Sequence, residues 1–362
     1  MTHSSFFVVW RIRSFFFFLI FTLLLAGCQD TAAPTAEYLE IGGETMGTYY
    51  QVTYADSLQR SFKEDIDALL LALNQEVSTY IDTATITAFN RSSRGIPLDY
   101  NPFGEDVPHD NQHLLRNFQA AKTISARTQG AFDPTVMPLV NYWGFGYAEK
   151  RKVTQVDSAR VDSLQQLVGM EKVFLRNDSL VKTSPGVQLD FSALAKGYGV
   201  DEIAAFLSGQ GVRNYYVEIG GEVVTKGRSP RGDNWRIGIS DPQEGAGLRD
   251  IQTAVPLIDE ALATSGNYRN VYEVNGQKFS HTINPVTGFP ERSRLLSASV
   301  FAPDCMTADA YATACMVAGP EQALAFAKND DQIEVYLIIS TESGDLDVRY
   351  SEGLAPFFNQ EQ

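Results

Sequence analysis

The stretch DFSALAKGYGVD, residues 190–201, sets one lysine among alanines and glycines and has an aspartate at each end. It predicts a helix start, with Ser192 as the N-cap and residues 193–196 as the first turn. First-turn amides attract anions, and Lys196 adds a compact positive charge beside them. Small residues serve equally to pack a helix closely on a sheet, and this stretch alone favours neither interpretation. We interpret Asp201, at the far end, as a solvated helix residue.

Segments on both sides of this stretch alternate between helical and extended patterns. Helical spacing of apolar residues predicts helices at 60–79, 111–130, 307–319 and 320–330. Runs rich in β-branched and aromatic residues predict strands at 214–219, 222–227, 235–240, 295–302 and 334–340. Because several strands follow one another without helices between them, we expect an α+β domain with a mixed or antiparallel sheet and flanking helices, and not a Rossmann order.

Composition restricts the classes of partner. The chain has 362 residues and a net charge of -15. This acidity argues against nucleic acid, because phosphate backbones are bound by clustered Lys and Arg. An acidic protein that handles an anionic substrate must instead concentrate its few cations at one place or recruit a metal ion.

The N-terminus reads as a bacterial lipoprotein signal. Arg11 and Arg13 precede the apolar run 14–27, and Ala-Gly stands directly before Cys28. We expect residues 1–27 to be removed, Cys28 to be lipidated, residues 28–38 to form the lipidated cysteine and tether, and residues 39–352 to form the domain. The alternative is an ordinary signal peptide or a signal anchor with an incidental cysteine. The lipoprotein interpretation places the protein in the bacterial cell envelope, anchored by lipid and facing the periplasm; it leaves open inner or outer membrane.

Four cysteine and histidine positions have simple structural explanations. Cys305 and Cys315 lie too far apart along a predicted helix for a disulfide, so we expect two separate buried thiols. His109 and His113 are four residues apart, a spacing that would place two zinc ligands on one helix face, but no third ligand follows at the usual spacing. A solvated helix start is the favoured interpretation of that pair.

Three further stretches carry groups suited to chemistry. Asp309 and Thr313 are four residues apart, and their oxygens suit Mg²⁺, although a helix-start Asp with an ordinary Thr is the simpler interpretation. His281 precedes a turn built on Asn284. It acts there either as an acid–base group or as a structural histidine that hydrogen-bonds to the backbone of the turn. Aromatic residues of the segment 132–145 surround Asp133, which suits a flat ligand or ordinary core packing.

Eight short motifs follow one another along nearly the whole predicted domain. They are MGTYY (46–50), STY (78–80), GAFDPTV (130–136), DFSALAKGYGVD (190–201), EIGGE (218–222), TSGNY (264–268), SHTINPVTGFP (280–290) and CMTADAYATA (305–314). In this order the chain resembles the ApbE family, the FAD:protein FMN transferases. We interpret the two glycines of EIGGE as a bulge or tight turn, because a phosphate-loop spacing is absent from that motif.

The resemblance implies a fold and a reaction. The fold is a single ApbE-like domain, T-fold-like or a roll. The reaction is Mg²⁺-dependent transfer of FMN from FAD to a Ser or Thr hydroxyl of an acceptor flavoprotein, with release of AMP. The implied acceptor is a subunit of a membrane redox complex or a periplasmic reductase.

The resemblance also implies which residues act. The implied metal ligands are Asp309, Thr313 and the Ala193 carbonyl. The implied FAD contacts are Met46, Tyr80, Ala131, Phe132, Asp133, Asp190, Lys196, His281 and Thr282. Lys196 would neutralise pyrophosphate charge, and His281 would orient or deprotonate the hydroxyl or assist the leaving phosphate. Asn284 stands where many relatives carry Asp, which makes it a poor candidate base.

Other functions use the same residues differently. An FAD pyrophosphatase would admit water in place of the acceptor hydroxyl and release FMN and AMP. A non-catalytic flavin-binding lipoprotein would leave FAD intact, and the pair Asp309 and Thr313 argues against it. An extracellular solute-binding lipoprotein would need two βαβ lobes, which the strand pattern does not predict.

Overall fold

The computed structural model describes residues 37–103, 109–146, 153, 155–242, 250–267, 271–274 and 277–358. The predicted signal segment, Cys28 and the tether up to residue 36 lie outside these ranges. The first strand begins at Tyr38, one residue before the predicted domain start. No helix in the described ranges is long and apolar enough to cross a membrane.

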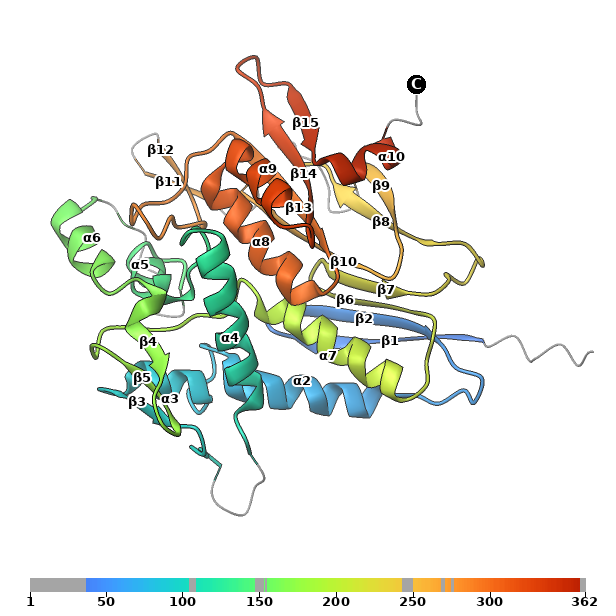
Figure 1. Cartoon of the computed structure of the whole chain (residues 1–362), viewed down its shortest axis with the longest axis horizontal. Helices are drawn as coiled ribbons and strands as arrows, with labels where there is room; N and C mark the ends of the chain where they lie inside the picture. Colours follow the sequence, from blue (N-terminus) through green and yellow to red (C-terminus); the bar gives the residue numbers. More distant parts are fainter. Residues whose placement is uncertain are drawn as a thin grey trace, which may run out of the picture.

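An eight-stranded sheet forms the centre of the molecule, in the order β1-β2-β6-β7-β10-β13-β14-β15 (Figure 1). Every strand pairing that the structure describes is antiparallel. The strands are β1 (Tyr38–Thr45), β2 (Thr48–Ala55), β6 (Tyr215–Ile219), β7 (Glu222–Lys226), β10 (Ala261–Gly266), β13 (Leu295–Ala302), β14 (Glu334–Ser340) and β15 (Leu346–Tyr350). The α+β expectation is confirmed, and the sheet is antiparallel and not mixed.

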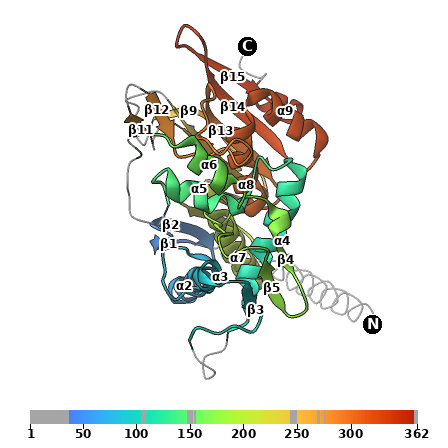
Figure 2. The same cartoon turned by 90° about the vertical axis from the view of Figure 1, so that its left-hand side faces the viewer.

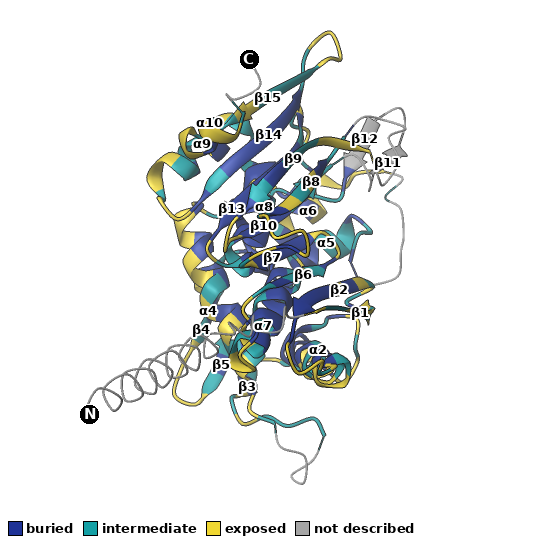
Figure 3. Ribbon diagram, turned by 90° about the vertical axis from the view of Figure 1, so that its right-hand side faces the viewer, coloured by how far each residue is buried: buried dark blue, intermediate teal, exposed yellow. Residues whose placement is uncertain are grey.

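Helices cover one face of this sheet. They are α2 (Lys63–Val77), α4 (Gln112–Arg127), α7 (Ala195–Gly209), α8 (Cys305–Ala318) and α9 (Pro320–Asn329). Alternation along the strands assigns the faces: Ala261 and Ala263 of β10 join the core under the helices, whereas Leu262 between them joins a cluster on the opposite face. The central strands of the sheet are buried, whereas the side of α9 that faces away from the sheet is exposed (Figure 3).

The opposite face of the sheet is partly covered by a second, two-stranded sheet. Its strands are β8 (Trp235–Ser240) and β9 (Ile251–Leu257), and α10 (Ala355–Phe358) packs beside them. The segment between α2 and α7 adds α3 (Thr85–Arg91) and a three-stranded sheet, β3 (Gly95–Pro97), β4 (Val173–Leu175) and β5 (Ser179–Lys182), next to α3 (Figure 2). It also adds η1 (Pro134–Val136), α5 (Met137–Tyr142) and α6 (Ser158–Gln165).

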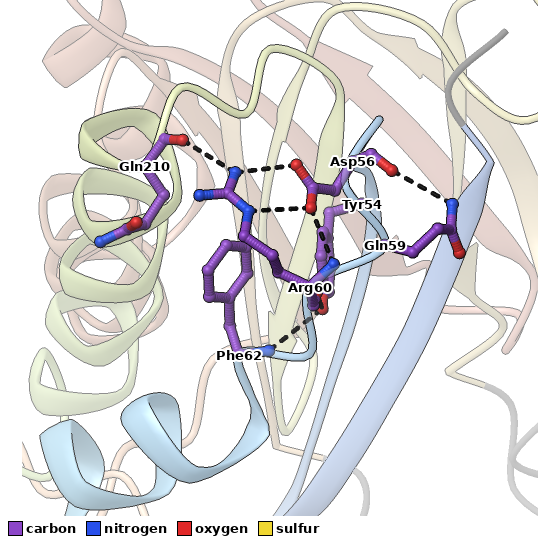
Figure 4. A network of polar contacts seen from close by, with 6 residues as sticks. All are labelled: Tyr54, Asp56, Gln59, Arg60, Phe62 and Gln210. Atoms are coloured by element: carbon purple, nitrogen blue, oxygen red, sulfur yellow. Dashed lines mark hydrogen bonds and ion pairs between the residues drawn. The ribbon is translucent and has the colours of Figure 1, made fainter. Parts of the chain in front are cut away.

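A partly exposed polar network around the buried Asp56 fixes the C-terminal end of α7 (Figure 4). Asp56, after β2, accepts hydrogen bonds from the Arg60 backbone N–H and from both Nε and Nη2 of its guanidinium. The same Nη2 donates to the Gln210 carbonyl at the end of α7, 3.1 Å away. The Arg60 side chain holds the pKa of Asp56 below its usual value. The helix is therefore tied to the β2–α2 loop at one end, while its other end carries Lys196.

The start of α7 differs from the prediction. The helix begins at Ala195 with Leu194 as N-cap, and the Ser192 hydroxyl donates to Asp190 Oδ1 at 2.6 Å instead of capping the helix. The amides of Leu194 and Ala195 both donate to the Phe191 carbonyl. The tight turn before the helix therefore already uses these two amide donors, and an anion site at this turn stays a prediction.

Asp201 is also different from its predicted role. Its carboxylate accepts the backbone N–H groups of Cys305 and Met306, at 2.8 Å each, at the start of α8. Burial raises the pKa of Asp201, and the two N–H groups that it accepts oppose that rise by stabilising the carboxylate. The interpretation as a solvated residue is wrong, because α8, which lies 104 residues further along the chain, packs over this side of α7.

The structure also tests the predictions for the two cysteines, the histidine pair and the Gly-Gly turn. Cys305 and Cys315 are buried free thiols, as expected. The histidine pair is split: His109 Nε2 lies 2.8 Å from Asn111 Oδ1, whereas His113 Nδ1 lies 2.9 Å from the Tyr198 hydroxyl. Gly220 and Gly221 have φ angles of 62° and 107° and form the tight turn between β6 and β7, which confirms the interpretation of EIGGE.

Candidate active site

A cavity of about 870 Å³ opens at the end of the sheet where β6 turns into β7 and β10 ends. Its wall is built by segments far apart in sequence: the turn before α7, the middle of α8, the loop before η1 and the segment after β12 (Gln277–Ser280). The predicted site residues in this wall are Tyr80, Ala131, Phe132, Asp133, Asp190, Ala193, Lys196, His281, Thr282, Asp309 and Thr313. This volume is in the range typical of small-molecule and cofactor sites.

Met46 is the predicted FAD contact that the structure does not bring into this wall. It lies in the turn between β1 and β2 with a φ of 49°, and its side chain packs against the core. A Cβ built on Gly199 of α7 would lie 3.2 Å from the Met46 methyl group. Within the described residues Met46 therefore packs against α7 and the core, and its contact with FAD stays a prediction.

Lys196 is the centre of an ionic cluster inside the cavity. Its Nζ lies 2.8 Å from Glu222 Oε1 and 3.7 Å from Asp309 Oδ2. Burial opposes the charge of Lys196, but the carboxylates of Asp309 and Glu222 outweigh it and raise the pKa of the ammonium above its usual value. Burial raises the pKa of Glu222, and the charge of Lys196 opposes that rise. A positive charge is thus held at this point of an acidic protein.

Glu222 is the functional residue that sequence reasoning missed. It belongs to the EIGGE motif and is the first residue of β7, yet it carried no predicted role. It is 4% exposed, and its Oε2 has no hydrogen-bond partner among the described residues. A glutamate directly after a Gly-Gly turn was the available signal, because a turn of that kind presents the next side chain at the end of a sheet.

The oxygen ligands predicted for Mg²⁺ lie together, and their chemistry fits that ion. Asp309 is 3% exposed, and Thr313 stands four residues later on α8, with its Oγ1 3.3 Å from Ser265 Oγ. The Gly197 N–H donates to Asp309 Oδ2 at 3.1 Å, so the Ala193 carbonyl does not receive the bond that a continuous helix would make. Carboxylate, hydroxyl and carbonyl oxygens are hard ligands, and the buried Glu222 Oε2 adds another acceptor nearby.

No group of three or more His, Cys, Asp and Glu side chains that could hold a metal is found in the described part of the chain. A site here depends on hydroxyl and carbonyl oxygens together with carboxylates, which favours magnesium over zinc.

The aromatic segment forms one wall of the cavity and also a local core. Trp143 is fully buried and donates its indole N–H to the Gly288 carbonyl at 2.8 Å, while Phe132 is 2% exposed. Asp133 accepts hydrogen bonds from the Thr135 N–H and hydroxyl, which makes it the cap of η1, and burial raises its pKa. Ordinary packing therefore explains most of this segment, and the same packing makes its cavity-facing surface rigid.

The remaining predicted residues are held by turns. Asp190 binds the backbone and hydroxyl of Ser192, and burial raises the pKa of its carboxyl. The Thr282 hydroxyl donates to Asn267 Oδ1 at 2.7 Å. Asn284 accepts the backbone N–H groups of Val286 and Thr287, so it stabilises the turn that follows His281. The His281 ring lies in the cavity wall, 6.4 Å from the ring of Phe145 between centroids.

Comparison with known proteins points to a single family. The model of the ApbE family matches residues 46–337. Curated relatives named FAD:protein FMN transferase include one from Vibrio cholerae, 37% identical over 328 residues, covering 89% of this chain and 92% of the relative. Another, from Escherichia coli K12, is 33% identical over 334 residues, covering 89% and 91%.

Solved structures give the same result. The flavin transferase ApbE from Vibrio cholerae superposes with a TM-score of 0.78 at 35% identity, covering 89% of this chain and all of that one. The apo flavinyl transferase ApbE from Pseudomonas stutzeri has a TM-score of 0.78 at 31% identity, covering 91% and 99%. The family model covers most of the chain, and these relatives share its sequence and its fold, so the chain belongs to the ApbE family.

Proposed function

We propose that this enzyme transfers FMN from FAD to a Ser or Thr hydroxyl of an acceptor flavoprotein and releases AMP, in a reaction that depends on Mg²⁺. The chain is a transferase of the ApbE family, and flavin transfer is the activity named for its relatives. The observation that carries the proposal is the single cavity that joins a cationic centre, a set of hard oxygen ligands and an aromatic wall.

The reaction is a displacement at the FMN-side phosphorus of FAD. The acceptor hydroxyl oxygen forms a bond to that phosphorus, the phosphoanhydride P–O bond breaks, and AMP leaves with the electron pair. The hydroxyl proton goes to a base in the site or to the leaving phosphate. No electron is transferred to or from the flavin, so the step requires no oxidant or reductant.

Residues of this chain would supply charge and position for that displacement. Lys196, held between Glu222 and Asp309, would face the dianionic pyrophosphate and offset the charge that develops on the leaving AMP. Asp309, Thr313 and the Ala193 carbonyl would hold Mg²⁺. When bound, Mg²⁺ would neutralise phosphate oxygens and so lower the barrier to displacement.

His281 would handle the proton of the acceptor hydroxyl. Its ring is in the cavity wall, and the turn anchored by Asn284 fixes the backbone just beyond it. A neutral imidazole is suited to take a proton near pH 7. Substitution His281→Ala is expected to lower the transfer rate by 10²-fold or more and to leave FAD binding within a few-fold of wild type. A wild-type transfer rate in this variant would refute the role.

One experiment separates this function from its rivals. The purified protein is incubated with FAD and Mg²⁺, with and without a candidate acceptor flavoprotein, and the products are measured by intact-protein mass spectrometry and flavin chromatography. We expect a covalent FMN adduct on Ser or Thr of the acceptor and an equal amount of AMP. Free FMN and AMP without any adduct would identify an FAD pyrophosphatase, and FAD that stays intact would identify a flavin-binding protein without catalysis.

We also propose that the enzyme works at the bacterial cell envelope, anchored through lipid on Cys28 and facing the periplasm. The support is the sequence Leu-Leu-Ala-Gly-Cys that ends the apolar run. Metabolic labelling with a radioactive fatty acid should mark the wild-type protein and leave a Cys28→Ala variant unlabelled. Equal labelling of both proteins would disprove lipidation at this residue.

A further inference from the structure

Two carboxylates, one on α7 and one just before α8, accept hydrogen bonds from the first turn of α8. Asp304, the residue before this helix, accepts the N–H and the hydroxyl of Thr307 at 2.8 and 2.9 Å. Asp201, from the middle of α7, accepts the N–H groups of Cys305 and Met306 with one oxygen each, at 2.8 Å. The first contact is local to α8, whereas the second ties α8 to α7.

The tie from Asp201 belongs to a close junction between the two helices. Gly197 lies four residues earlier, on the same face of α7, and its N–H donates to Asp309 Oδ2 at 3.1 Å. A Cβ at Gly197 would lie only 2.2 Å from the Cys305 carbonyl oxygen, so the backbones are in direct contact. The helices are thus joined at two points one turn apart, and Lys196 stands next to the second.

We infer that Asp201 is a positioning residue, which holds α8 at the register on α7 that brings Asp309 and Thr313 to Lys196 and the Ala193 carbonyl. This inference rests on the proposed function, because it assigns a purpose to the ligand set of that site. Asp201 is not among the residues that line the cavity, and it acts through the backbone of α8.

The geometry explains why a carboxylate is needed at this position. Two oxygens that accept two successive N–H groups restrain both the height and the rotation of the first turn, whereas a single acceptor restrains only one contact. Asp309 follows Cys305 by four residues, about one helical turn or roughly 6 Å along the axis. A rigid helix therefore carries any shift of its first turn directly to Asp309 and Thr313.

Three variants test the inference against simple loss of a helix cap. Asp201→Ala and Asp304→Ala each remove a carboxylate that accepts hydrogen bonds in the first turn of α8, but only the first also breaks the link to α7. Asp201→Asn keeps one acceptor oxygen and the side-chain shape, and it serves as the conservative variant if Asp201→Ala does not fold.

The readout is the melting temperature as a function of Mg²⁺ concentration, with FAD present, because a ligand that binds only the folded protein raises that temperature. For Asp304→Ala we expect a lower melting temperature but a half-saturating Mg²⁺ concentration within about twofold of wild type. For Asp201→Ala we expect the half-saturating Mg²⁺ concentration to rise tenfold or more, which is typical when a residue that orients a metal ligand is lost. For Asp201→Asn we expect a smaller rise. FAD affinity, from quenching of flavin fluorescence, should change less than threefold.

Equal Mg²⁺ responses in Asp201→Ala and Asp304→Ala, or a wild-type response in both Asp201 variants, would overturn the inference. A wild-type protein whose melting temperature ignores Mg²⁺ would overturn the metal assignment and this inference together. A wild-type protein that responds to Mg²⁺ but forms no FMN adduct on any acceptor would refute the proposed reaction and leave the role of Asp201 standing.

Discussion

Substitution of Gly197 by alanine tests the helix junction at the centre of the site. The added Cβ would lie 2.2 Å from the Cys305 carbonyl oxygen, 2.6 Å from its carbon and 2.8 Å from the Met306 nitrogen. All three are backbone atoms, so no side chain can rotate away. An ordinary contact needs about 1 Å more than the shortest of these distances, so α7 and α8 must separate by roughly that amount.

The expected magnitudes follow from this displacement. Overpacking against backbone costs about 3 kcal/mol, and alanine recovers about 1 kcal/mol through its helix propensity, which leaves a net loss of about 2 kcal/mol in the free energy of unfolding. The separation also lengthens the Gly197 N–H to Asp309 hydrogen bond and moves Asp309 relative to Lys196. A misplacement of about 1 Å in a catalytic group lowers rates by about 10²-fold.

Gly209, the last residue of the same helix, is the matched control. A Cβ there has no atom within 4 Å, so Gly209→Ala should gain up to about 1 kcal/mol and keep full activity. The assay is urea unfolding for stability and the initial rate of FMN transfer to an acceptor protein at saturating FAD and Mg²⁺. The reasoning is refuted if Gly197→Ala keeps wild-type stability and rate, or if both glycine variants lose activity equally.

Further substitutions test other parts of the argument. Thr313→Val keeps the shape and removes the hydroxyl; we expect the half-saturating Mg²⁺ concentration for transfer to rise tenfold or more, and an unchanged value would exclude Thr313 as a ligand. Asp56→Asn should lower the free energy of unfolding at pH 7, because the amide accepts fewer hydrogen bonds from Arg60 and solvent screens only part of that loss. Arg60 lowers the pKa of Asp56 in the folded protein, so the ionised carboxylate stabilises the fold above the ordinary pKa of 3.8 and loses this effect as the pH falls through the lower folded value. The difference in stability between wild type and Asp56→Asn should therefore shrink below pH 4 in urea titrations. A difference that stays constant with pH would contradict this. The buried Lys182 ammonium donates hydrogen bonds to three backbone carbonyls. Lys182→Met should therefore lower the free energy of unfolding by about 3 kcal/mol in the same titrations, without changing the FAD affinity of the folded protein. Unchanged stability would show that other donors replace these bonds.

The sequence itself determined the bounds of several helices and strands and named the segments that line the cavity. Strands β13 and β14 have the predicted bounds, and α2, α4, α8 and α9 begin and end within a few residues of theirs. These elements have strong local signals, because apolar periodicity and turn residues act over only a few positions. The motif order also indicated which segments meet at the cavity, since all predicted site residues except Met46 lie in its wall.

Tertiary structure decided what individual side chains do there. Sequence alone did not reveal that Ser192 serves the turn before α7, that Glu222 pairs with Lys196, or that Asp201 accepts hydrogen bonds from α8. The last two pairings join residues from separate elements, and local pattern does not specify which face of a helix another element will cover. In the stretch 190–201, Gly197 and Asp201 pack α7 against α8, and that packing places Lys196 beside Asp309.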